Sequence, residues 1–397
     1  MKTRVAVLFG GHSVEHEVSI ISGLQALGAM DTAKYDAFPL YITKDNRFFV
    51  GENLRRVQSF RQMDACLAQA TRVIPVPGDG CVELWRHPAK KFGNNVVAAF
   101  DVAIPVVHGT NVEDGTLMGY LELLGVPYAA CDVTSSALGM DKYAMKAALK
   151  QAGIPVLEAL QYSGKDYAVD GEAVLDEIEQ KIGYPVIVKP VNLGSSVGIS
   201  KAKDRASLID AMDLAVSFSA RVLVERAVPN LREINCSVLG DGEEARASAC
   251  EEPLNAEDIL TFSDKYLSGG SKKNGVSGGM TDLKRRCPAD LPEGMTEQVQ
   301  QLAVQTFKAL GCLGVARIDF LNDKETGELW VNEINTIPGS LSFYLWQEVG
   351  VSFAQLMDEL VNLAFKRQRR REALTFTYES NILEGFGGTK GAKGSKM

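Results

Sequence analysis

The stretch RIDFLNDKETGELWVNEINTIPGS (317–340) has the pattern of two strands joined by a polar turn. Side chains alternate between the two faces of a strand, so Arg317 and Asp319 share one face. Antiparallel pairing would gather Asp319, Glu333 and Asn335 into one cluster of oxygen atoms, with Arg317 beside it. Hard oxygen ligands of this kind suit Mg²⁺. A solvated hairpin face with ordinary charges is the alternative interpretation of this stretch taken alone.

A second segment, YPVIVKPVNLGSSVGISK (184–201), combines an apolar strand with a loop rich in glycine and serine. Such a loop exposes backbone N–H groups to phosphate oxygens, and Lys189 adds a positive charge. The segment lacks the G-x-x-x-x-G-K-[ST] pattern of a P-loop, and no G-x-G-x-x-G fingerprint follows the first strand. A glycine-rich hairpin without a ligand is the alternative.

A third segment, HGTNVEDGTLMG (108–119), follows a predicted strand. Open α/β sheets bind ligands at the carboxyl ends of their strands, which makes His108 a candidate binding residue. A histidine buried in the core is the alternative interpretation of this segment.

Strand and helix patterns alternate at the start of the chain, which predicts an open α/β domain. Strands are expected at 4–9, 35–43, 97–107 and 127–131. A helix should follow Asp141 as its N-cap and stop at Gly153.

The later part of the chain favours an α/β class that becomes α+β toward the C-terminus. Strands around one helix are expected in the centre, followed by more strands, a helix over 294–310 and the hairpin. The predicted units are an N-terminal domain (1–130), a central unit (131–228), a C-terminal unit (229–366), and a basic helix end with a flexible tail (367–397).

The composition is that of a folded protein, because 46% of the 397 residues are hydrophobic and 23% are charged. A formal net charge of −8 argues against general binding of nucleic acid or of an anionic membrane surface. No stretch approaches the roughly 18 apolar residues of a membrane span. The seven cysteines include no C-x-x-C pair, so a reduced, cytoplasmic setting is expected rather than a zinc site or disulfides.

Taken together, these segments closely resemble the D-alanine–D-alanine ligases, which are members of the ATP-grasp superfamily. The motifs that carry the resemblance occur in the family's order: GGHSVEHEVS (10–19), HGTNVEDG (108–115), MDK (140–142), PVIVKPVNLGSSVG (185–198), DKY (264–266), ARIDF (316–320) and NEINTIPG (332–339). The resemblance runs from residue 1 to about 365. It implies an ATP-grasp architecture that follows the open α/β domain and binds ATP between the central and C-terminal units.

The resemblance also implies a set of nucleotide-binding residues. Lys142 and Lys189 would contact the phosphates of ATP, and Lys265 would reach the γ-phosphate from a loop that closes as a lid. Glu225 would accept a hydrogen bond from the adenine amino group. Glu233 would bind the ribose hydroxyls, although this chain has one residue more than the family between those two glutamates.

Metal and catalytic roles follow from the same resemblance. Asp319, Glu333 and Asn335 would hold two Mg²⁺ ions, with Mn²⁺ as an alternative metal. Arg317 and the amide of Gly339 would stabilise the negative charge that develops during acyl transfer.

The remaining implied residues bind the amino acids. Glu15 would pair with the ammonium group of the first amino acid, in a hydrogen-bond network with Ser195 and Tyr266. His108 becomes a substrate-site residue in this comparison. The candidates near the second amino acid are Ser340, Ser342 and Tyr344.

Several positions depart from the family pattern. Val112 stands where the family usually has glycine, and Met118 stands where it has glutamine. Tyr344 falls where a serine commonly binds the carboxylate of the second substrate. The segment between Lys265 and Cys287 is also longer than in typical members.

The implied function is the ATP-dependent joining of two D-alanines through an acyl phosphate, for peptidoglycan precursor synthesis. A relative that uses D-serine or another acceptor is the first alternative. A catalytically dead nucleotide-binding regulator is the second. Tyr266 after Lys265 resembles the members that form dipeptides, which favours an amine acceptor over D-lactate. The expected partners are small molecules, and the family's habit is a homodimer.

Overall fold

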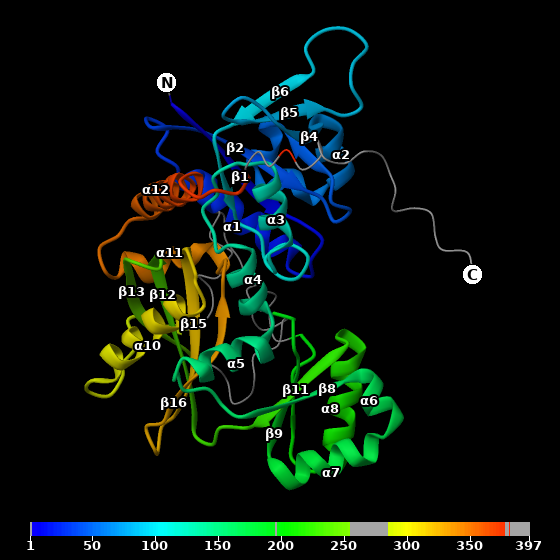
Figure 1. The fold of residues 1–397 in the computed structure, drawn as a ribbon, viewed down its shortest axis with the longest axis vertical. Helices are drawn as coiled ribbons and strands as arrows, with labels where there is room; N and C mark the ends of the chain where they lie inside the picture. The colour runs from blue at the N-terminus through cyan, green and yellow to red at the C-terminus, as the bar shows by residue number, and fades with distance from the viewer. Residues whose placement is uncertain (1, 195–196, 255–284, 378–380, 382–397) are drawn as a thin grey trace.

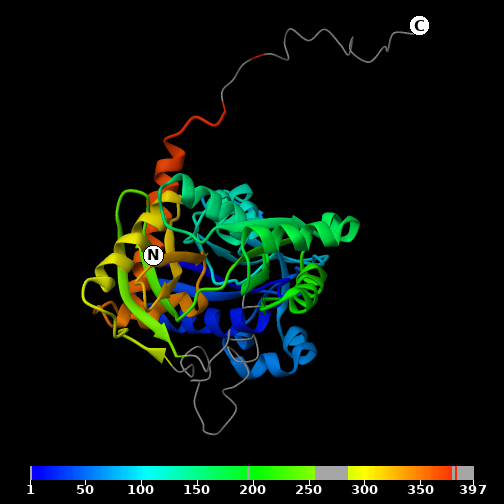
Figure 2. The same cartoon turned by 90° about the horizontal axis from the view of Figure 1, so that it is seen from below.

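The computed structural model describes residues 2–194, 197–254, 285–377 and 381. They form three sheets, of seven, four and five strands. The seven-stranded N-terminal sheet lies at one end of the molecule (Figure 1). The other two sheets lie side by side at the opposite end (Figures 1 and 2). The predicted α/β class is therefore confirmed.

The N-terminal sheet has the order β6-β5-β4-β3-β2-β1-β7. Its parallel part consists of β1 (Thr3–Gly10), β2 (Tyr35–Ile42) and β7 (Val102–Pro105). Its antiparallel part consists of β3 (Phe48–Val50), β4 (Thr71–Pro77), β5 (Val82–Arg86) and β6 (Val96–Phe100). The helices of this domain are α1 (His16–Ala29), η1 (Glu52–Arg55), η2 (Val57–Arg61), α2 (Met63–Gln69) and α3 (Thr116–Leu123).

Two strand predictions in this domain need correction. The single strand expected over 97–107 is two strands, β6 and β7, because the chain turns at Asp101, whose carboxylate accepts the backbone N–H of Arg4 at 2.8 Å. The strand expected over 127–131 is reduced to one bridge between Tyr128 and Ala103.

The carboxyl ends of β1 and β7 meet because these strands are parallel neighbours. Gly10 ends β1 with a φ of +96°, and a Cβ there would lie 2.2 Å from the carbonyl oxygen of Ile42. Only glycine permits this sharp exit from the strand. The chain then reaches Glu15 at the start of α1, while the end of β7 leads directly to His108. Two predicted site segments thus converge at one edge of the sheet.

The central sheet has the order β10-β9-β11-β8. Its strands are β8 (Ala159–Ser163), β9 (Val186–Pro190), β10 (Ser200–Ala202) and β11 (Arg221–Arg226). Three helices accompany it where one was expected: α6 (Gly164–Val169), α7 (Gly171–Lys181) and α8 (Arg205–Phe218). Asp170 caps the start of α7 by accepting the backbone N–H of Ala173, which divides α6 from α7.

The C-terminal sheet has the order β14-β13-β12-β15-β16. Its strands are β12 (Leu231–Gly240), β13 (Ala245–Pro253), β14 (Arg285–Arg286), β15 (Gly314–Asp323) and β16 (Leu329–Asn335). The helix α10 (Met295–Ala309) confirms the helix expected over 294–310. The predicted antiparallel hairpin is β15 and β16, in which Asp319 pairs with Glu333 and Arg317 with Asn335.

Helices α4 (Val133–Met140) and α5 (Lys142–Gln151) join the N-terminal domain to the rest of the chain. Asp141 caps α5, as predicted, by accepting the backbone N–H of Ala144 at 2.9 Å. Met145 and Leu149 of α5 belong to the same hydrophobic core as Phe307 and Ile318, so α5 packs with the C-terminal sheet.

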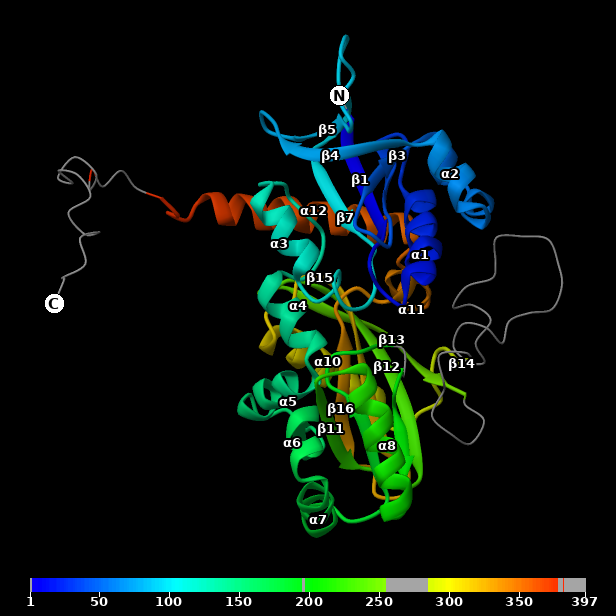
Figure 3. The same cartoon turned by 90° about the vertical axis from the view of Figure 1, so that its right-hand side faces the viewer.

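The chain ends with η4 (Gly339–Ser342), α11 (Phe343–Gln347) and α12 (Phe353–Glu372). Leu356 and Leu360 of α12 share a core with Val5 and Leu8 of β1. Figure 3 shows α12 running between the N-terminal sheet, above it in this view, and the C-terminal sheet, below it. The last helix of the chain therefore covers the first domain. In the described part of the chain, no helix is both long and apolar enough to span a membrane.

Candidate active site

The hairpin β15–β16 brings the predicted metal ligands together. Asp319 and Glu333 are directly opposite on the two strands. Arg317 donates from Nε and Nη2 to the two carboxylate oxygens of Asp319, each at 2.7 Å. Asn335 donates from Nδ2 to Asp319 at 3.1 Å. The alternation of side chains in the sequence thus predicts the correct shared face.

These residues fit a divalent cation of the hard, oxygen-binding kind. Two carboxylates and one amide oxygen lie on the same face of the hairpin, and all three are hard oxygen donors. Lys142 Nζ lies 3.3 Å from Glu333, so both carboxylates already face a cation. Among the described residues no group of three His, Cys, Asp or Glu side chains could hold a metal.

A buried network of two lysines and one glutamate lies behind the glycine- and serine-rich loop. Lys189 Nζ is 2.5 Å from one oxygen of Glu225, and Lys146 Nζ is 2.9 Å from the other. Burial raises the pKa of the Glu225 carboxyl, but the two lysines outweigh this effect and leave that pKa below its ordinary value. Lys189 also donates to Asn332 of β16 at 3.1 Å. The network therefore connects the central sheet with the hairpin.

Lys146 was missed by the sequence reasoning. It lies one helical turn after Lys142 on α5, and that spacing was the available signal. Burial lowers the pKa of the Lys146 ammonium, and Glu225 opposes this shift.

Of the other predicted nucleotide-binding residues, Lys142 and Glu233 are among the described residues. Lys142 Nζ donates to the carbonyl of Leu193 at 2.6 Å, which places it between the loop and Glu333. Glu233 lies on β12, paired with Leu321 of β15. Ser195, Lys265 and Tyr266 lie outside the described residues, as do most of the long segment between Lys265 and Cys287 and most of the tail.

Glu15 lies where three segments meet. Its side chain is buried, next to the turn after β7 and the start of the glycine-rich loop. A Cβ at Gly109 would lie 2.8 Å from Glu15 Oε2, and a Cβ at Gly194 would lie 3.1 Å from it. Glycine at these two positions leaves room for the carboxylate.

His108 is a buried histidine with both ring nitrogens engaged. Nδ1 is 2.9 Å from the carbonyl oxygen of Ile337, and Nε2 is 3.0 Å from the hydroxyl of Ser22. Ser22 also accepts the backbone N–H of Ser340 at 3.0 Å. His108 thus supports the segment after β16, and a direct bond to a substrate would require one of these contacts to break.

Replacing His108 by glutamine should reduce the loss of stability on acidification. Burial lowers the pKa of His108 to about 4, from an ordinary 6.5. Stability from the neutral ring is therefore present above pH 6.5 and is lost as the pH falls to about 4, by up to about 3 kcal/mol. Burial and Glu15 raise the pKa of Glu113 to about 7. Its contribution to the free energy of unfolding therefore changes with pH in the opposite direction, and it does so equally in the wild type and in His108→Gln.

The test compares urea unfolding between pH 4 and pH 7 for the wild type and His108→Gln, with the exposed His87→Gln as the control. Equal pH slopes for the wild type and His108→Gln would contradict the assigned titration.

The turn η4 has an unusual backbone. Ser340, Leu341 and Ser342 have φ values of 52°, 54° and 50°, in the left-handed region that non-glycine residues rarely adopt. The Ser340 hydroxyl donates to Gln25 at 2.6 Å. The Ser342 hydroxyl is buried and has no hydrogen-bond partner within the described residues. Sequence patterns carry no signal for this turn, because residues 340–342 include no glycine.

Tyr344 is held by charged residues that the sequence reasoning missed. Its hydroxyl donates to Glu251 Oε1 at 2.8 Å. The guanidinium of Arg285 lies 4.0 Å from the centre of its ring. Glu251 is buried and also accepts from Asn235 at 3.0 Å. The phenolic proton of Tyr344 is therefore already committed within the protein.

The basic end of α12 joins two domains. Arg367 and Arg371 form ion pairs with Glu122 of α3. Lys366 and Arg370 approach the buried Asp241, after β12, at 2.7 and 3.1 Å. The predicted helix end at 367 is thus part of a helix that continues to residue 372.

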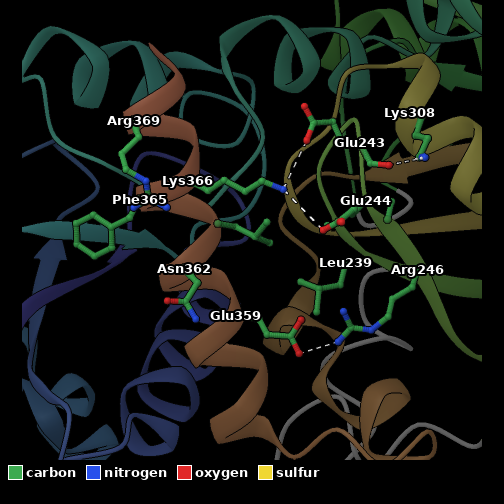
Figure 4. A pocket seen from close by; sticks show the side chains of 13 residues that line it. Leu239, Glu243, Glu244, Arg246, Lys308, Glu359, Asn362, Phe365, Lys366 and Arg369 are labelled. Carbon is green, nitrogen blue, oxygen red and sulfur yellow. Dashed lines mark hydrogen bonds and ion pairs between the residues drawn. The ribbon is translucent and has the colours of Figure 1, made fainter. Parts of the chain in front are cut away.

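A pocket of about 750 Å³ lies between α12 and the turn from β12 to β13 (Figure 4). Two of its charged side chains pair with each other, because Arg246 is 2.7 Å from Glu359, and Lys308 donates to the backbone carbonyl of Glu243 at 3.0 Å. The pocket is separate from the hairpin cluster.

Replacing Asp241 by asparagine should destabilise the protein by about 2 kcal/mol, because one change weakens two ion pairs and two backbone contacts. The backbone N–H groups of Glu243 and Glu244 both donate to Asp241 at 2.9 Å. Burial opposes ionisation, yet these N–H groups and Lys366 lower the pKa of Asp241 to about 2. This stabilisation is present above pH 3.8 and is lost as the pH falls to about 2.

Urea unfolding at pH 7 measures the effect, with the exposed Asp79→Asn as the control. An Asp241→Asn protein as stable as the wild type would mean that these contacts contribute nothing net.

Family models and sequence relatives of known function match nearly the whole chain. Family models described as the D-ala D-ala ligase N-terminus and C-terminus match residues 4–131 and 148–362. A D-alanine–D-alanine ligase of Acetivibrio thermocellus is 40% identical over 92% of the chain and 96% of the relative. One from Thermosipho melanesiensis is 36% identical over 96% of the chain and 98% of the relative.

Solved structures agree with the sequence relatives. A D-alanine–D-alanine ligase of Coxiella burnetii has a TM-score of 0.76 at 30% identity, and the match covers 94% of the chain and 96% of that structure. The VanG D-Ala:D-Ser ligase of Enterococcus faecalis has a TM-score of 0.75 at 31% identity, over 92% of the chain and all of that structure.

Proposed function

Because the chain belongs to the D-alanine–D-alanine ligase family, we propose that it joins two D-alanines at the expense of ATP for peptidoglycan precursor synthesis. The family has the ATP-grasp fold that the sequence predicts, and it uses ATP and a divalent metal. The observation that carries the proposal is the β15–β16 hairpin, where Asp319 lies opposite Glu333 and bonds Arg317, while Lys142 Nζ lies 3.3 Å from Glu333. These are the residues that would supply the phosphate, metal and acyl-transfer groups of the reaction.

The chemistry follows from the weakness of a carboxylate as an electrophile. ATP converts the carboxylate of the first D-alanine to an acyl phosphate, and ADP leaves. The amine of the second D-alanine attacks the acyl carbon, and the tetrahedral intermediate expels phosphate. Glu15 would hold the ammonium group of the first D-alanine, with Ser195 and Tyr266 in its network. Arg317 and the Gly339 amide would stabilise the negative charge on the reacting oxygens.

For the nucleotide, Lys142, Lys189 and Lys265 would bind the phosphates. Glu225 would accept from the adenine amino group, and Glu233 would bind the ribose. Because Lys189 Nζ lies 2.5 Å from Glu225, Lys189 would have to turn from the glutamate toward the phosphates when ATP binds. Lys146 would then remain as the partner of Glu225.

For the metal, Asp319, Glu333 and Asn335 would hold two Mg²⁺ ions, with Mn²⁺ as an alternative. A bound metal supplies positive charge against the phosphate oxygens.

The acceptor is the part of the assignment with a competing candidate. A D-alanine–D-serine ligase is supported by the similarity to the VanG structure and by Tyr344 at the position counted as the family's carboxylate-binding serine. The greater similarity to D-alanine–D-alanine ligases favours D-alanine. We also propose that the protein is a homodimer and acts in the cytoplasm.

The test is mass spectrometry of the products formed from ATP, Mg²⁺ and a panel of D- and L-amino acids. D-alanyl-D-alanine should be the main product, and phosphate release should require added D-alanine. A product containing another acceptor would select the alternative ligase. Phosphate release that ignores all amino acids, with no dipeptide, would refute the ligase assignment.

A further inference from the structure

Glu113 is a buried carboxylate with bonds to two parts of the site. It belongs to the segment after β7, and its side chain is 7% exposed. Its Oε2 accepts the backbone N–H of Gly109 at 3.0 Å. Its Oε1 accepts the backbone N–H of Ile337 at 2.8 Å and the hydroxyl of Thr336 at 3.3 Å. One carboxylate thus connects the ends of β7 and β16, which belong to different sheets.

The peptide of Ile337 is held on both sides by this segment. Glu113 accepts from its N–H, and His108 Nδ1 lies 2.9 Å from its carbonyl oxygen. Asn335 lies two residues before Ile337, and Gly339 lies two residues after it. The clamp therefore sits midway between a proposed metal ligand and the proposed donor to the reacting oxygen.

The other oxygen of Glu113, Oε2, bonds the segment that follows β7. It holds Gly109, whose Cα faces Glu15 so closely that a Cβ there would lie 2.8 Å from Glu15 Oε2. Glu113 is thus the side chain that bonds both the segment facing Glu15 and the 335–339 segment, while His108 holds only the latter.

This arrangement is poorly suited to stability alone. Glu113 is a carboxylate in a buried place close to a second carboxylate, Glu15, and both burial and that neighbour raise its pKa. Ionised groups are costly to bury, so the hydrogen bonds from Gly109, Ile337 and Thr336 must offset that cost before Glu113 adds any stability. Acyl transfer, in contrast, is sensitive to displacements of about 1 Å between reacting groups.

We propose that Glu113 is a positioning residue for the ligation reaction, whose carboxylate sets the spacing between Glu15 and the Asn335–Gly339 segment by bonding Gly109 and Ile337 at once. This role rests on the proposed function. Glutamine cannot replace it, because its single carbonyl oxygen accepts from only one side and its NH₂ group meets the N–H of the other. Aspartate is too short to reach both.

The experiment uses Glu113→Gln and Glu113→Asp in the full chain, with Glu122→Gln as the matched control. Glu122 also connects two domains, through Arg367 and Arg371, but lies away from the site. Both Glu113 variants should lower kcat about tenfold or more, with the KM for ATP within twofold of the wild type. Glu122→Gln should lower the melting temperature and leave kcat unchanged.

Hydrogen exchange gives a second readout that needs no activity. Peptides containing Ile337 should exchange faster in Glu113→Gln than in the wild type, and those containing residues 186–190 should not. A normal kcat in Glu113→Gln, or a loss of kcat that only follows a loss of folded protein, would overturn the positioning role. A wild type that forms no dipeptide would refute the proposed function instead, while unchanged exchange at Ile337 would still overturn the clamp.

Discussion

Replacing Asn335 by alanine, or Glu333 by alanine, should lower kcat at least about 100-fold while the protein stays folded. Each change removes one oxygen ligand from the face that Asp319 and Glu333 share across β15 and β16. The side chains of Asp319 and Glu333 are 14% and 22% exposed, so the loss falls on a surface that receives a ligand rather than on the core. The metal would then be held less firmly near the phosphate that is transferred. We expect both the formation of the acyl phosphate and the attack by the second D-alanine to be slower.

The measurement is kcat at increasing Mg²⁺, together with a thermal melt of each variant. The exposed Glu328→Gln, on the turn of the same hairpin, is the matched control and should behave as the wild type. Near-normal turnover at saturating Mg²⁺ in both ligand variants would refute the metal assignment.

Replacing Tyr344 by serine should change the relative kcat/KM of acceptors by about 10- to 150-fold, the range expected for one altered hydrogen bond to a carboxylate. Serine removes the ring that Arg285 contacts at 4.0 Å and releases Glu251 from its bond to the phenol. Tyr344→Phe keeps the ring. It should preserve the acceptor ranking more closely, because the phenolic proton goes to Glu251 rather than to a substrate.

The assay compares D-alanine, D-serine and D-lactate as acceptors for the wild type and both variants, with Tyr167→Phe on α6 as a control for the chemical change. Identical rankings and rates in all three enzymes would place Tyr344 outside the second subsite.

Local patterns were sufficient for several elements. The alternation of side chains in 317–335 predicted the hairpin and its face, because the two strands are close in sequence and a polar turn fixes their pairing. Asp141 predicted the start of α5 for the same local reason. The family motifs name Glu15, Lys142 and Lys189 as site residues, and the structure brings their segments together. The roles of these residues, like those of Ser195, Lys265 and Tyr266, stay predictions.

The numbers of strands and helices were predicted less well than their positions. Asp101 divides one apolar run into β6 and β7, because its carboxylate binds Arg4 on a neighbouring strand. The central unit has three helices rather than one, since α6 and α7 are short and separated by a cap at Asp170.

The sequence by itself determined the hairpin, the start of α5 and the chemical types gathered at the site, because periodicity, caps and motifs are local properties. The tertiary structure alone decided which distant groups support them. His108 and Ile337 are 229 positions apart, and Tyr344 and Glu251 are 93 apart. Contacts such as these, together with the left-handed turn at 340–342, depend on how three sheets pack against one another. That packing gives buried polar groups such as His108 and Glu251 their hydrogen-bond partners, and no short stretch of sequence contains it.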